Sequence, residues 1–246
     1  MFVGVDVGSV SVKVVALDKN LAITYSKYAR HNGHPFEVLI QLLDELHAVS
    51  GKSHSPVLGI TGSAGKLLEE LIGGKFVNEI IAHSKSAEFF HPDAKSIIEV
   101  GGEDSKLILL GKDASTGKVI IEEFFTNTIC AAGTGSFLDQ QAKRLGVNIE
   151  GEFGELALKS KNPPRIAGRC SVFAKTDMIH LQQEATPVYD IVAGLCFAFA
   201  RNFKSSICKA KKLEKPILFQ GGVASNKGMV RAFNAVFGLK DEIIVP

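Results

Sequence analysis

The sequence of 246 residues contains only four cysteines, and no two of them form a C-x-x-C pair. The spacing typical of many metal sites is therefore missing, and spacing alone favours cysteines buried as small apolar side chains. A strand-like run begins directly at Met1, with no basic segment and no small-residue cleavage site of a signal peptide. With few cysteines and no secretion signal, the sequence predicts a cytoplasmic protein with free thiols.

An excess of charge of one sign is also lacking. The 28 basic residues nearly balance the 26 acidic ones, the net charge is +2, and the chain has no basic arm or acidic tail. We therefore expect no nucleic acid partner. The longest apolar run, residues 191–200, is too short to span a bilayer, so no membrane partner is expected either. With 46% hydrophobic residues and no low-complexity linker, the chain can bury a core in one large domain or two lobes.

The hydrophobic pattern repeats one arrangement in both halves of the chain. Each half begins with strand, glycine turn, strand, turn and strand, expected at 2–7, 11–17 and 21–29, and again at 96–100, 106–110 and 118–125. Helical periodicity is expected at 36–49, from about 66, and at 78–90, 136–145, 153–159, 172–184, 189–210 and 227–237. Further short strands are expected at 57–60, 216–220 and 242–245. The sequence thus predicts an α/β protein with a duplicated supersecondary unit.

The first turn of each half has the composition of a phosphate-binding loop. Residues 6–13 read Asp-Val-Gly-Ser-Val-Ser-Val-Lys, and residues 99–106 read Glu-Val-Gly-Gly-Glu-Asp-Ser-Lys. Backbone N–H groups of such turns can cradle phosphate oxygens, and a nearby carboxylate can hold Mg²⁺. One turn of this kind is a weak signal, whereas two in matching places are a stronger one. The candidate residues are Asp6, Gly8, Ser9, Ser11, Lys13, Gly101, Gly102, Glu103 and Asp104.

Two lysines of these turns and two further segments are also relevant to nucleotide binding. Lys13 and Lys106 could contact phosphate, although a solvated strand lysine is the simpler interpretation of each. Gly221, Gly222 and Asn226 lie in a turn that opens a late helix, where glycine lets the backbone approach an adenosine closely. Residues 59–66 resemble a P-loop but lack its glycine spacing and its Ser or Thr after the lysine, so they are either a connection near the nucleotide or an ordinary strand–helix turn.

A cysteine precedes a glycine-rich helix start in residues 127–138. Gly133, Thr134 and Gly135 open this helix, and the N–H groups and dipole of a helix start favour negative charge. That field would favour the thiolate of Cys130, the form that binds metal. Cys170 lies in a second segment, Gly-Arg-Cys-Ser-Val-Phe. We hypothesise that Cys130 and Cys170 are metal–sulfur ligands. The remaining two cysteines, Cys196 and Cys208, fall in a long apolar helix and are expected in the core, and the seven histidines show no metal-binding spacing.

These segments together resemble the superfamily of actin, sugar kinases and heat-shock chaperone ATPases. Within it, the chain is similar to the ATPase activators of 2-hydroxyacyl-CoA dehydratases and the related benzoyl-CoA reductase ATPase subunits. The Cys-Ala-Ala-Gly-Thr-Gly and Gly-Arg-Cys-Ser-Val-Phe-Ala-Lys segments are the specific ones. The resemblance implies a two-lobed actin-like, ribonuclease H-like fold with duplicated mixed sheets and a nucleotide cleft between the lobes, residues 1–91 and 92–246.

The resemblance also implies a mechanism. Such activators are homodimers that share one four-iron, four-sulfur (4Fe–4S) cluster, with two cysteines from each subunit, which places the ligands at Cys130 and Cys170. ATP, hydrolysed to ADP with Mg²⁺ at Asp6 and Asp104, would swing the lobes in a hinge motion. One low-potential electron would then pass to an iron–sulfur dehydratase or reductase partner.

Two features depart from the short activators. Glu103 stands where they typically have Gln, and it could orient or deprotonate the attacking water, which adds it to Asp6 and Asp104 as a catalytic candidate. The sequence also stops after an apolar strand, which suggests a fragment of a longer activase of CoA-substrate-specific enzymes. The alternatives are a sugar or acyl kinase with structural cysteines, and a regulatory nucleotide-binding module without turnover.

Overall fold

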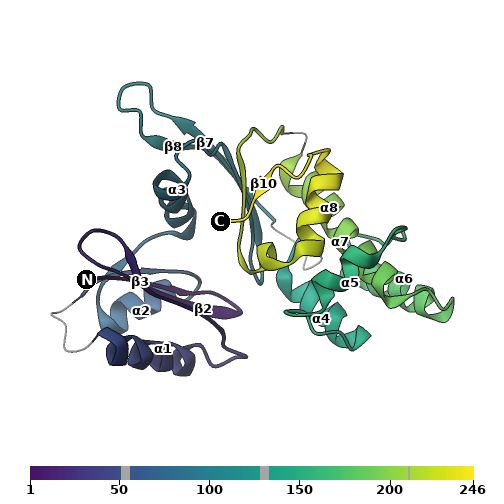
Figure 1. Ribbon diagram of the computed structural model, residues 1–246, viewed down its shortest axis with the longest axis horizontal. Helices are drawn as coiled ribbons and strands as arrows, with labels where there is room; N and C mark the ends of the chain where they lie inside the picture. The colour runs from purple at the N-terminus through teal and green to yellow at the C-terminus, as the bar shows by residue number, and fades with distance from the viewer. Residues whose placement is uncertain (51–55, 128–132, 210) are drawn as a thin grey trace. The chain divides into compact units, whose positions relative to one another are not determined.

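A computed structural model describes residues 1–50, 56–127, 133–209 and 211–246 of the chain. The chain forms two compact units, Met1–Lys85 (unit 1) and Ser86–Pro246 (unit 2), coloured purple to blue and blue to yellow in Figure 1. The division falls within α3, Glu79–Phe90. The lobe boundary after residue 91 stays a prediction, and Cys130 lies outside the described residues.

Unit 1 contains one mixed sheet in the order β3-β2-β1-β4-β5. The β1–β2 and β2–β3 pairs are antiparallel, whereas β4 runs parallel to β1 and β5 parallel to β4. Alternate valines of β1 are buried in a core that also contains leucines of the first helix, as expected for a strand with one face against a helix. Its elements are β1 (Phe2–Val7), β2 (Ser11–Leu17), β3 (Ile23–Arg30), α1 (Pro35–Ser50), β4 (Val57–Thr61), α2 (Gly65–Ile72) and β5 (Lys75–Phe76).

Unit 2 repeats this sheet in the order β10-β9-β6-β7-β8, with the same pattern of antiparallel and parallel pairs. The predicted duplication of the supersecondary unit is therefore confirmed. Helices lie along one side of this sheet in Figure 1. The elements are β6 (Ser96–Val100), β7 (Ser105–Lys112), β8 (Val119–Thr126), α4 (Gly135–Leu145), α5 (Phe153–Lys159), α6 (Ser171–Gln183), α7 (Val188–Phe203), β9 (Ile217–Gln220), α8 (Lys227–Phe237) and β10 (Ile243–Ile244).

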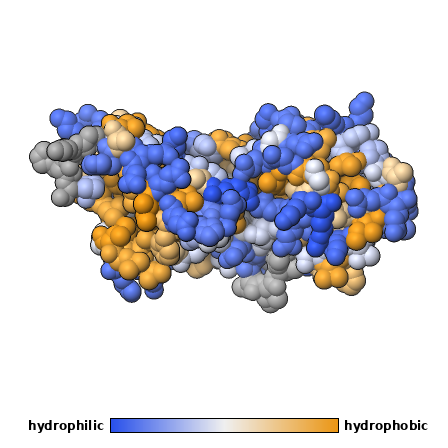
Figure 2. Space-filling model, turned by 90° about the horizontal axis from the view of Figure 1, so that it is seen from below, coloured by the Kyte–Doolittle hydropathy of each residue, from blue (hydrophilic) through white to orange (hydrophobic). Residues whose placement is uncertain are grey.

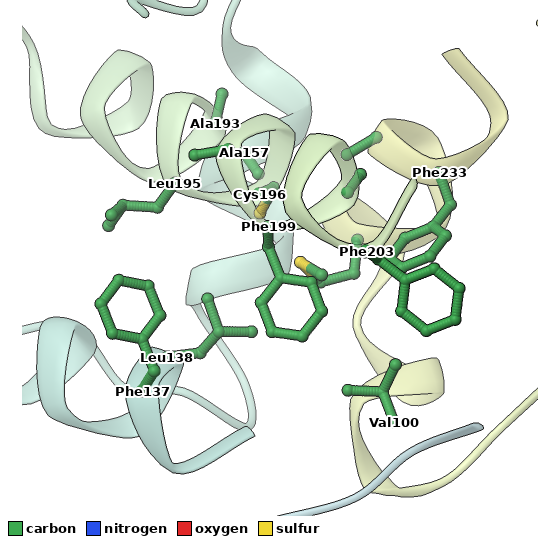
Figure 3. Packing of buried hydrophobic residues seen from close by; sticks show 14 of the residues in the cluster. Val100, Phe137, Leu138, Ala157, Ala193, Leu195, Cys196, Phe199, Phe203 and Phe233 are labelled. Atoms are coloured by element: carbon green, nitrogen blue, oxygen red, sulfur yellow. The ribbon is translucent and has the colours of Figure 1, made fainter. Parts of the chain in front are cut away.

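Helix α7 forms the centre of the core of unit 2. Figure 3 shows Phe199 and Phe203 of α7 close to Phe233 of α8, and the rings of Phe203 and Phe233 meet edge to face at a centroid distance of 5.2 Å. The segment Val188–Cys208 is long and apolar enough in composition to cross a membrane, but 72% of its most apolar stretch is buried within the unit. Burial on all sides explains why α7 is apolar around its whole circumference.

Two of the element ends that differ from the sequence prediction have a clear cause in side-chain hydrogen bonds or backbone conformation. The strand expected from residue 21 begins at Ile23, because Leu21 has a φ of +64° and belongs to a turn in which Asp18 Oδ1 accepts the Ala22 N–H at 2.9 Å. The helix expected to reach residue 210 ends at Phe203 and continues as a π-helix, Lys204–Cys208. The hydroxyls of Ser205 and Ser206 donate to the Asn202 carbonyl oxygen, and such donors compete with the α-helical ladder.

Helices α1 and α2 carry apolar residues on more than their buried faces. Ile40, Leu67, Leu71 and Ile72 are all exposed, with Leu71 retaining 64% of its accessible surface. Figure 2 shows hydrophobic side chains gathered on part of the visible surface of unit 1. Both helices therefore present apolar surface outward as well as inward.

The crossing of α5 and α8 depends on glycine. A Cβ atom on Gly228 would lie 2.4 Å from Ala157 Cβ, so Gly228→Ala is expected to lower the free energy of unfolding by about 1–3 kcal/mol through overpacking. Gly151→Ala is the matched control, since its Cβ would meet nothing within 4 Å, and a change of no more than about 0.5 kcal/mol is expected. Urea unfolding followed by circular dichroism measures both, and equal destabilisation would contradict the packing argument.

Candidate functional site

The first hairpin of each unit has the same geometry. In unit 1, Asp6 on β1 pairs in register with Lys13 on β2, and in unit 2 Glu99 on β6 pairs with Lys106 on β7. The connecting turns also match. The Gly8 N–H donates to the Ser11 carbonyl oxygen at 3.0 Å, and the Gly101 N–H donates to the Asp104 carbonyl oxygen at 2.9 Å. Glu99, and not Asp104, is thus the counterpart of Asp6.

Both turns leave two successive N–H groups unpaired at their tips. Within the described part of the chain, the N–H groups of Ser9 and Val10 in unit 1, and of Gly102 and Glu103 in unit 2, have no protein acceptor. All four residues are half-buried or exposed. Successive free N–H groups in a turn form a concavity suited to an anion. The geometry of both predicted turns therefore allows phosphate binding.

The two lysines differ in their environment. Lys13 lies 3.0 Å from Asp6, and both side chains retain 37% of their accessible surface. Lys106 is buried, and its Nζ contacts Glu99 at 3.0 Å and Asp104 at 2.7 Å. The simpler interpretation of Lys106 as a solvated strand lysine is therefore wrong, because the side chain neutralises two carboxylates. The two Mg²⁺ candidates, Asp6 and Asp104, are each paired with a lysine.

In each unit, the glycine that directly follows the fourth strand lies against the acidic side chain. Thr61 and Gln220 lie beside Asp6 and Glu99 in the parallel register, and each precedes a glycine with positive φ, +92° at Gly62 and +87° at Gly221. A Cβ on Gly62 would lie 2.5 Å from Asp6 Oδ1, and one on Gly221 would lie 2.8 Å from Glu99 Oε1. The sequence analysis gave Gly221 as a candidate site residue, whereas Glu99 and Gly62 appeared only within the segments 99–106 and 59–66. A glycine directly after a short apolar strand in each half was the available signal.

The start of α4 is attached to the second hairpin. The Gly135 and Ser136 N–H groups donate to the Gly101 and Gly102 carbonyl oxygens at 2.9 and 2.8 Å, and the Ser105 hydroxyl donates to the Gly133 carbonyl oxygen at 2.6 Å. Thr134 is the N-cap, and its side chain accepts the Phe137 N–H. The first N–H groups of α4 therefore bind protein acceptors. The structure brings Gly133, Thr134 and Gly135 together with Gly101 and Gly102.

The segment 221–226 lies in the same region of unit 2. A short 3₁₀ turn, Gly222–Ser225, precedes α8, and Asn226 caps that helix by accepting the Met229 N–H at 3.1 Å. A Cβ on Gly135 would lie 3.2 Å from Val223 Cγ2, so this turn packs against the start of α4. Asn226 thus has a structural role as a cap, and the contact of Gly221, Gly222 and Asn226 with a nucleoside stays a prediction.

The three described cysteines fall into two kinds. Cys196 and Cys208 are buried, burial raises the pKa of each thiol to about 12, and the prediction that they belong to the core is confirmed. Cys170 is half-buried with a free thiol and forms the N-cap position of α6. The preceding loop is held by Asp177 Oδ2, which accepts the Ala167 N–H at 2.8 Å. Of the described cysteines, Cys170 alone is accessible.

Two arginines lie at the segment that leads to Cys170. Arg201 on α7 donates to the Ile166 carbonyl oxygen at 3.3 Å, and burial together with the charge of Arg165 lowers the pKa of Arg201. Neither arginine has a carboxylate within ion-pair distance among residues 1–50, 56–127, 133–209 and 211–246. Uncompensated positive charge beside this segment favours an anionic group there. Within those same ranges, no group of three or more His, Cys, Asp or Glu side chains could hold a metal ion.

The duplicated mixed sheets and the matched glycine turns are typical of the actin-like ATPase fold. A solved structure of the activator of the 2-hydroxyisocaproyl-CoA dehydratase from Clostridium difficile with bound ADPNP has a TM-score of 0.87 and 30% identity, and covers 100% of this chain and 88% of that one. Component A of the Acidaminococcus fermentans (R)-2-hydroxyglutaryl-CoA dehydratase has a TM-score of 0.85 and 27% identity, with 100% and 91% covered. The predicted two-lobed actin-like fold is confirmed.

The family can be stated more narrowly. The model of the BadF/BadG/BcrA/BcrD ATPase family matches residues 3–244, and the chain belongs to this family. The chain is also 32% identical over 242 residues to the activator of lactoyl-CoA dehydratase from Anaerotignum propionicum, which covers 98% of this chain and 90% of that protein. The resemblance found in the sequence is therefore confirmed, and with it the assignment to an ATPase family.

Proposed function

We propose that this chain is an ATP-hydrolysing activator that delivers a low-potential electron to a 2-hydroxyacyl-CoA dehydratase-like or benzoyl-CoA reductase-like partner. The observation that carries the nucleotide part is the pair of matched turns, each with two unpaired N–H groups and a carboxylate at its base. Asp6 and Asp104 would hold Mg²⁺ beside the phosphates. Glu103, exposed at the tip of the second turn, would orient the attacking water.

The electron-transfer part rests on the surroundings of Cys170. Its accessible thiol and the uncompensated Arg165 and Arg201 suit an anionic cluster, since a site with four thiolate ligands carries net negative charge. Cys130 and Cys170 from each of two copies would hold one 4Fe–4S cluster in a homodimer. When bound, that cluster supplies the capacity to accept and donate one electron at low potential.

The start of α4 offers a physical connection between the two parts. In the second turn, the Gly101 and Gly102 carbonyl oxygens accept hydrogen bonds from the Gly135 and Ser136 N–H groups. In the sequence, these two residues directly follow the segment that contains Cys130. A nucleotide that favours one position of this turn therefore acts on the start of α4. It can change the equilibrium between two dimer shapes only by the difference in its affinity for them.

Replacing Cys170 tests the redox part of the proposal. After anaerobic purification or reconstitution, iron and acid-labile sulfide analysis of the wild type is expected to give about two irons per chain, one half of a shared 4Fe–4S cluster. Cys170→Ala is expected to lose nearly all of this iron, because the shared cluster loses two of its four ligands. Cys196→Ala is the matched control, since Cys196 is buried in the core and should leave the iron content unchanged.

Two outcomes would contradict the proposal. A wild-type chain that stays iron-free after reconstitution but still hydrolyses ATP would overturn the redox role and favour a kinase or regulatory module on the same fold. Full iron retention in Cys170→Ala would exclude Cys170 as a ligand. Electron transfer itself is then measured as ATP-dependent reduction of a low-potential dye acceptor by the dithionite-reduced wild type.

A further inference from the structure

We propose that His31 is a positioning residue for nucleotide phosphate binding, because it orients the Gly8–Ser9 peptide of the first turn. This inference rests on the proposed function, since it takes that turn as the phosphate loop. His31 follows β3 directly and retains only 8% of its accessible surface. The sequence analysis gave it no role, because nothing in the spacing of the histidines indicates one.

The hydrogen bonds of the imidazole define its tautomer. The Gly33 N–H points to Nδ1 at 3.1 Å, so Nδ1 is an acceptor. A neutral imidazole with an acceptor at Nδ1 carries its proton on Nε2, and this N–H lies 3.2 Å from the Gly8 carbonyl oxygen. The backbone N–H of His31 also donates to the Val10 carbonyl oxygen at 3.1 Å. His31 therefore binds two carbonyl groups of the turn from one side.

Fixing the Gly8 carbonyl also fixes the next N–H group. In a planar trans peptide the C=O and N–H bonds point in opposite directions. Because the Gly8 carbonyl points to His31, the Ser9 N–H points away from it, and this N–H has no acceptor in the described chain. The Gly8 N–H is held by the Ser11 carbonyl oxygen, so neither end of Gly8 is free to rotate. The turn is thus set in a phosphate-binding conformation before the ligand arrives, which lowers the ordering cost of binding.

The second unit supports this argument independently. Gly101 is the counterpart of Gly8, and its carbonyl oxygen also has a donor from outside the hairpin, the Gly135 N–H at 2.9 Å. The same carbonyl is therefore fixed in both units by different means. In unit 2 the donor is the backbone N–H at the start of α4, whereas in unit 1 the donor is the side chain of His31, which lies between β3 and α1.

Three variants of the full chain test the role of His31. His31→Phe keeps an aromatic ring but has no donor, His31→Gln keeps an amide N–H of similar reach, and His34→Phe is the control, because His34 is largely exposed. Isothermal titration calorimetry with Mg·ADP, Mg·ATP and adenosine measures binding. His31→Phe is expected to weaken both phosphate-bearing ligands at least tenfold, to leave adenosine binding unchanged, and to be partly rescued in His31→Gln.

The ligand series separates positioning from general stabilisation. Equal loss for adenosine and for the phosphate-bearing ligands, or no rescue by His31→Gln, would show that His31 only stabilises the unit and would overturn the inference. Unchanged Mg·ATP affinity in His31→Phe would overturn it as well, while the proposed function would stand. A wild-type chain that binds no Mg·ATP would overturn both, and circular dichroism verifies that each variant is folded.

Discussion

Lys106→Met is expected to lower the free energy of unfolding by about 3–5 kcal/mol, the range for removing one partner of a buried ion pair. Lys106 is 2% exposed and lies between Glu99, which is 6% exposed, and Asp104. Removing its charge takes away the cation that contacts the buried Glu99 carboxylate at 3.0 Å, and methionine cannot replace the two ionic hydrogen bonds. Urea unfolding monitored by circular dichroism gives the change directly.

The duplication of the fold provides the matched control. Lys13→Met removes the lysine at the equivalent register position, but Lys13 and Asp6 are partly exposed, so the expected loss is about 0–1 kcal/mol. The double variant Glu99→Leu with Lys106→Met is expected to recover much of the lost stability, because no buried charge is then left uncompensated. Equal effects at Lys13 and Lys106 would show that burial does not decide the strength of this pair.

Gly221→Ala is expected to destabilise unit 2 by about 3 kcal/mol or more. The φ of +87° at Gly221 already costs a non-glycine residue about 1–2 kcal/mol, and the added Cβ would lie 2.3 Å from the Val100 carbonyl oxygen. Since Val100 directly precedes the second turn, movement of its backbone would also displace Gly101 and Gly102. We therefore expect Mg·ATP affinity to fall together with stability.

Gly117→Ala separates backbone conformation from steric contact. Gly117 lies between β7 and β8 with a φ of +68°, and a Cβ there would meet nothing within 4 Å. The expected loss is about 1–2 kcal/mol, from the backbone conformation alone, with unchanged nucleotide affinity. If both variants lost the same stability, the contact between Gly221 and the Val100 carbonyl would carry no additional energy. Thermal unfolding and calorimetric titration of both variants make the comparison.

Much of the architecture was accessible from periodicity. The paired hydrophobic runs at the start of each half predicted two equivalent three-stranded antiparallel segments, and both are present. The ends of elements were less accessible where side chains compete with the backbone. The Asp18 turn delays β3, and the Ser205 and Ser206 hydroxyls convert the end of α7 into a π-helix. Neither effect changes a hydrophobic period, so no pattern of apolar residues indicates it.

The candidate site, like the fold, was predictable from the sequence only in part. The sequence indicated both glycine turns, because acid, glycine and lysine recur there at identical spacing. It gave His31 no role, included Gly62 only within the P-loop-like segment 59–66, and favoured a solvated Lys106 over one that contacts phosphate. These residues act through contacts across the sheet, and a pattern along the chain does not show which lysine is buried against which carboxylate.

The sequence by itself determined the local features of this protein: its duplicated α/β units, its two glycine turns and its resemblance to an ATPase family. These follow from short-range chemistry, since glycine, charge and apolar periodicity act on neighbouring residues. Only the tertiary structure decided which groups of the turns are free. The pairing of β1 with β4 and of β6 with β9 places Gly62 against Asp6 and Gly221 against Glu99. Hydrogen bonds from His31 and from the start of α4 fix the Gly8 and Gly101 carbonyl groups. Hydrogen bonds between segments far apart in the chain therefore fix both turns, while the N–H groups at each turn tip keep no protein acceptor among the described residues.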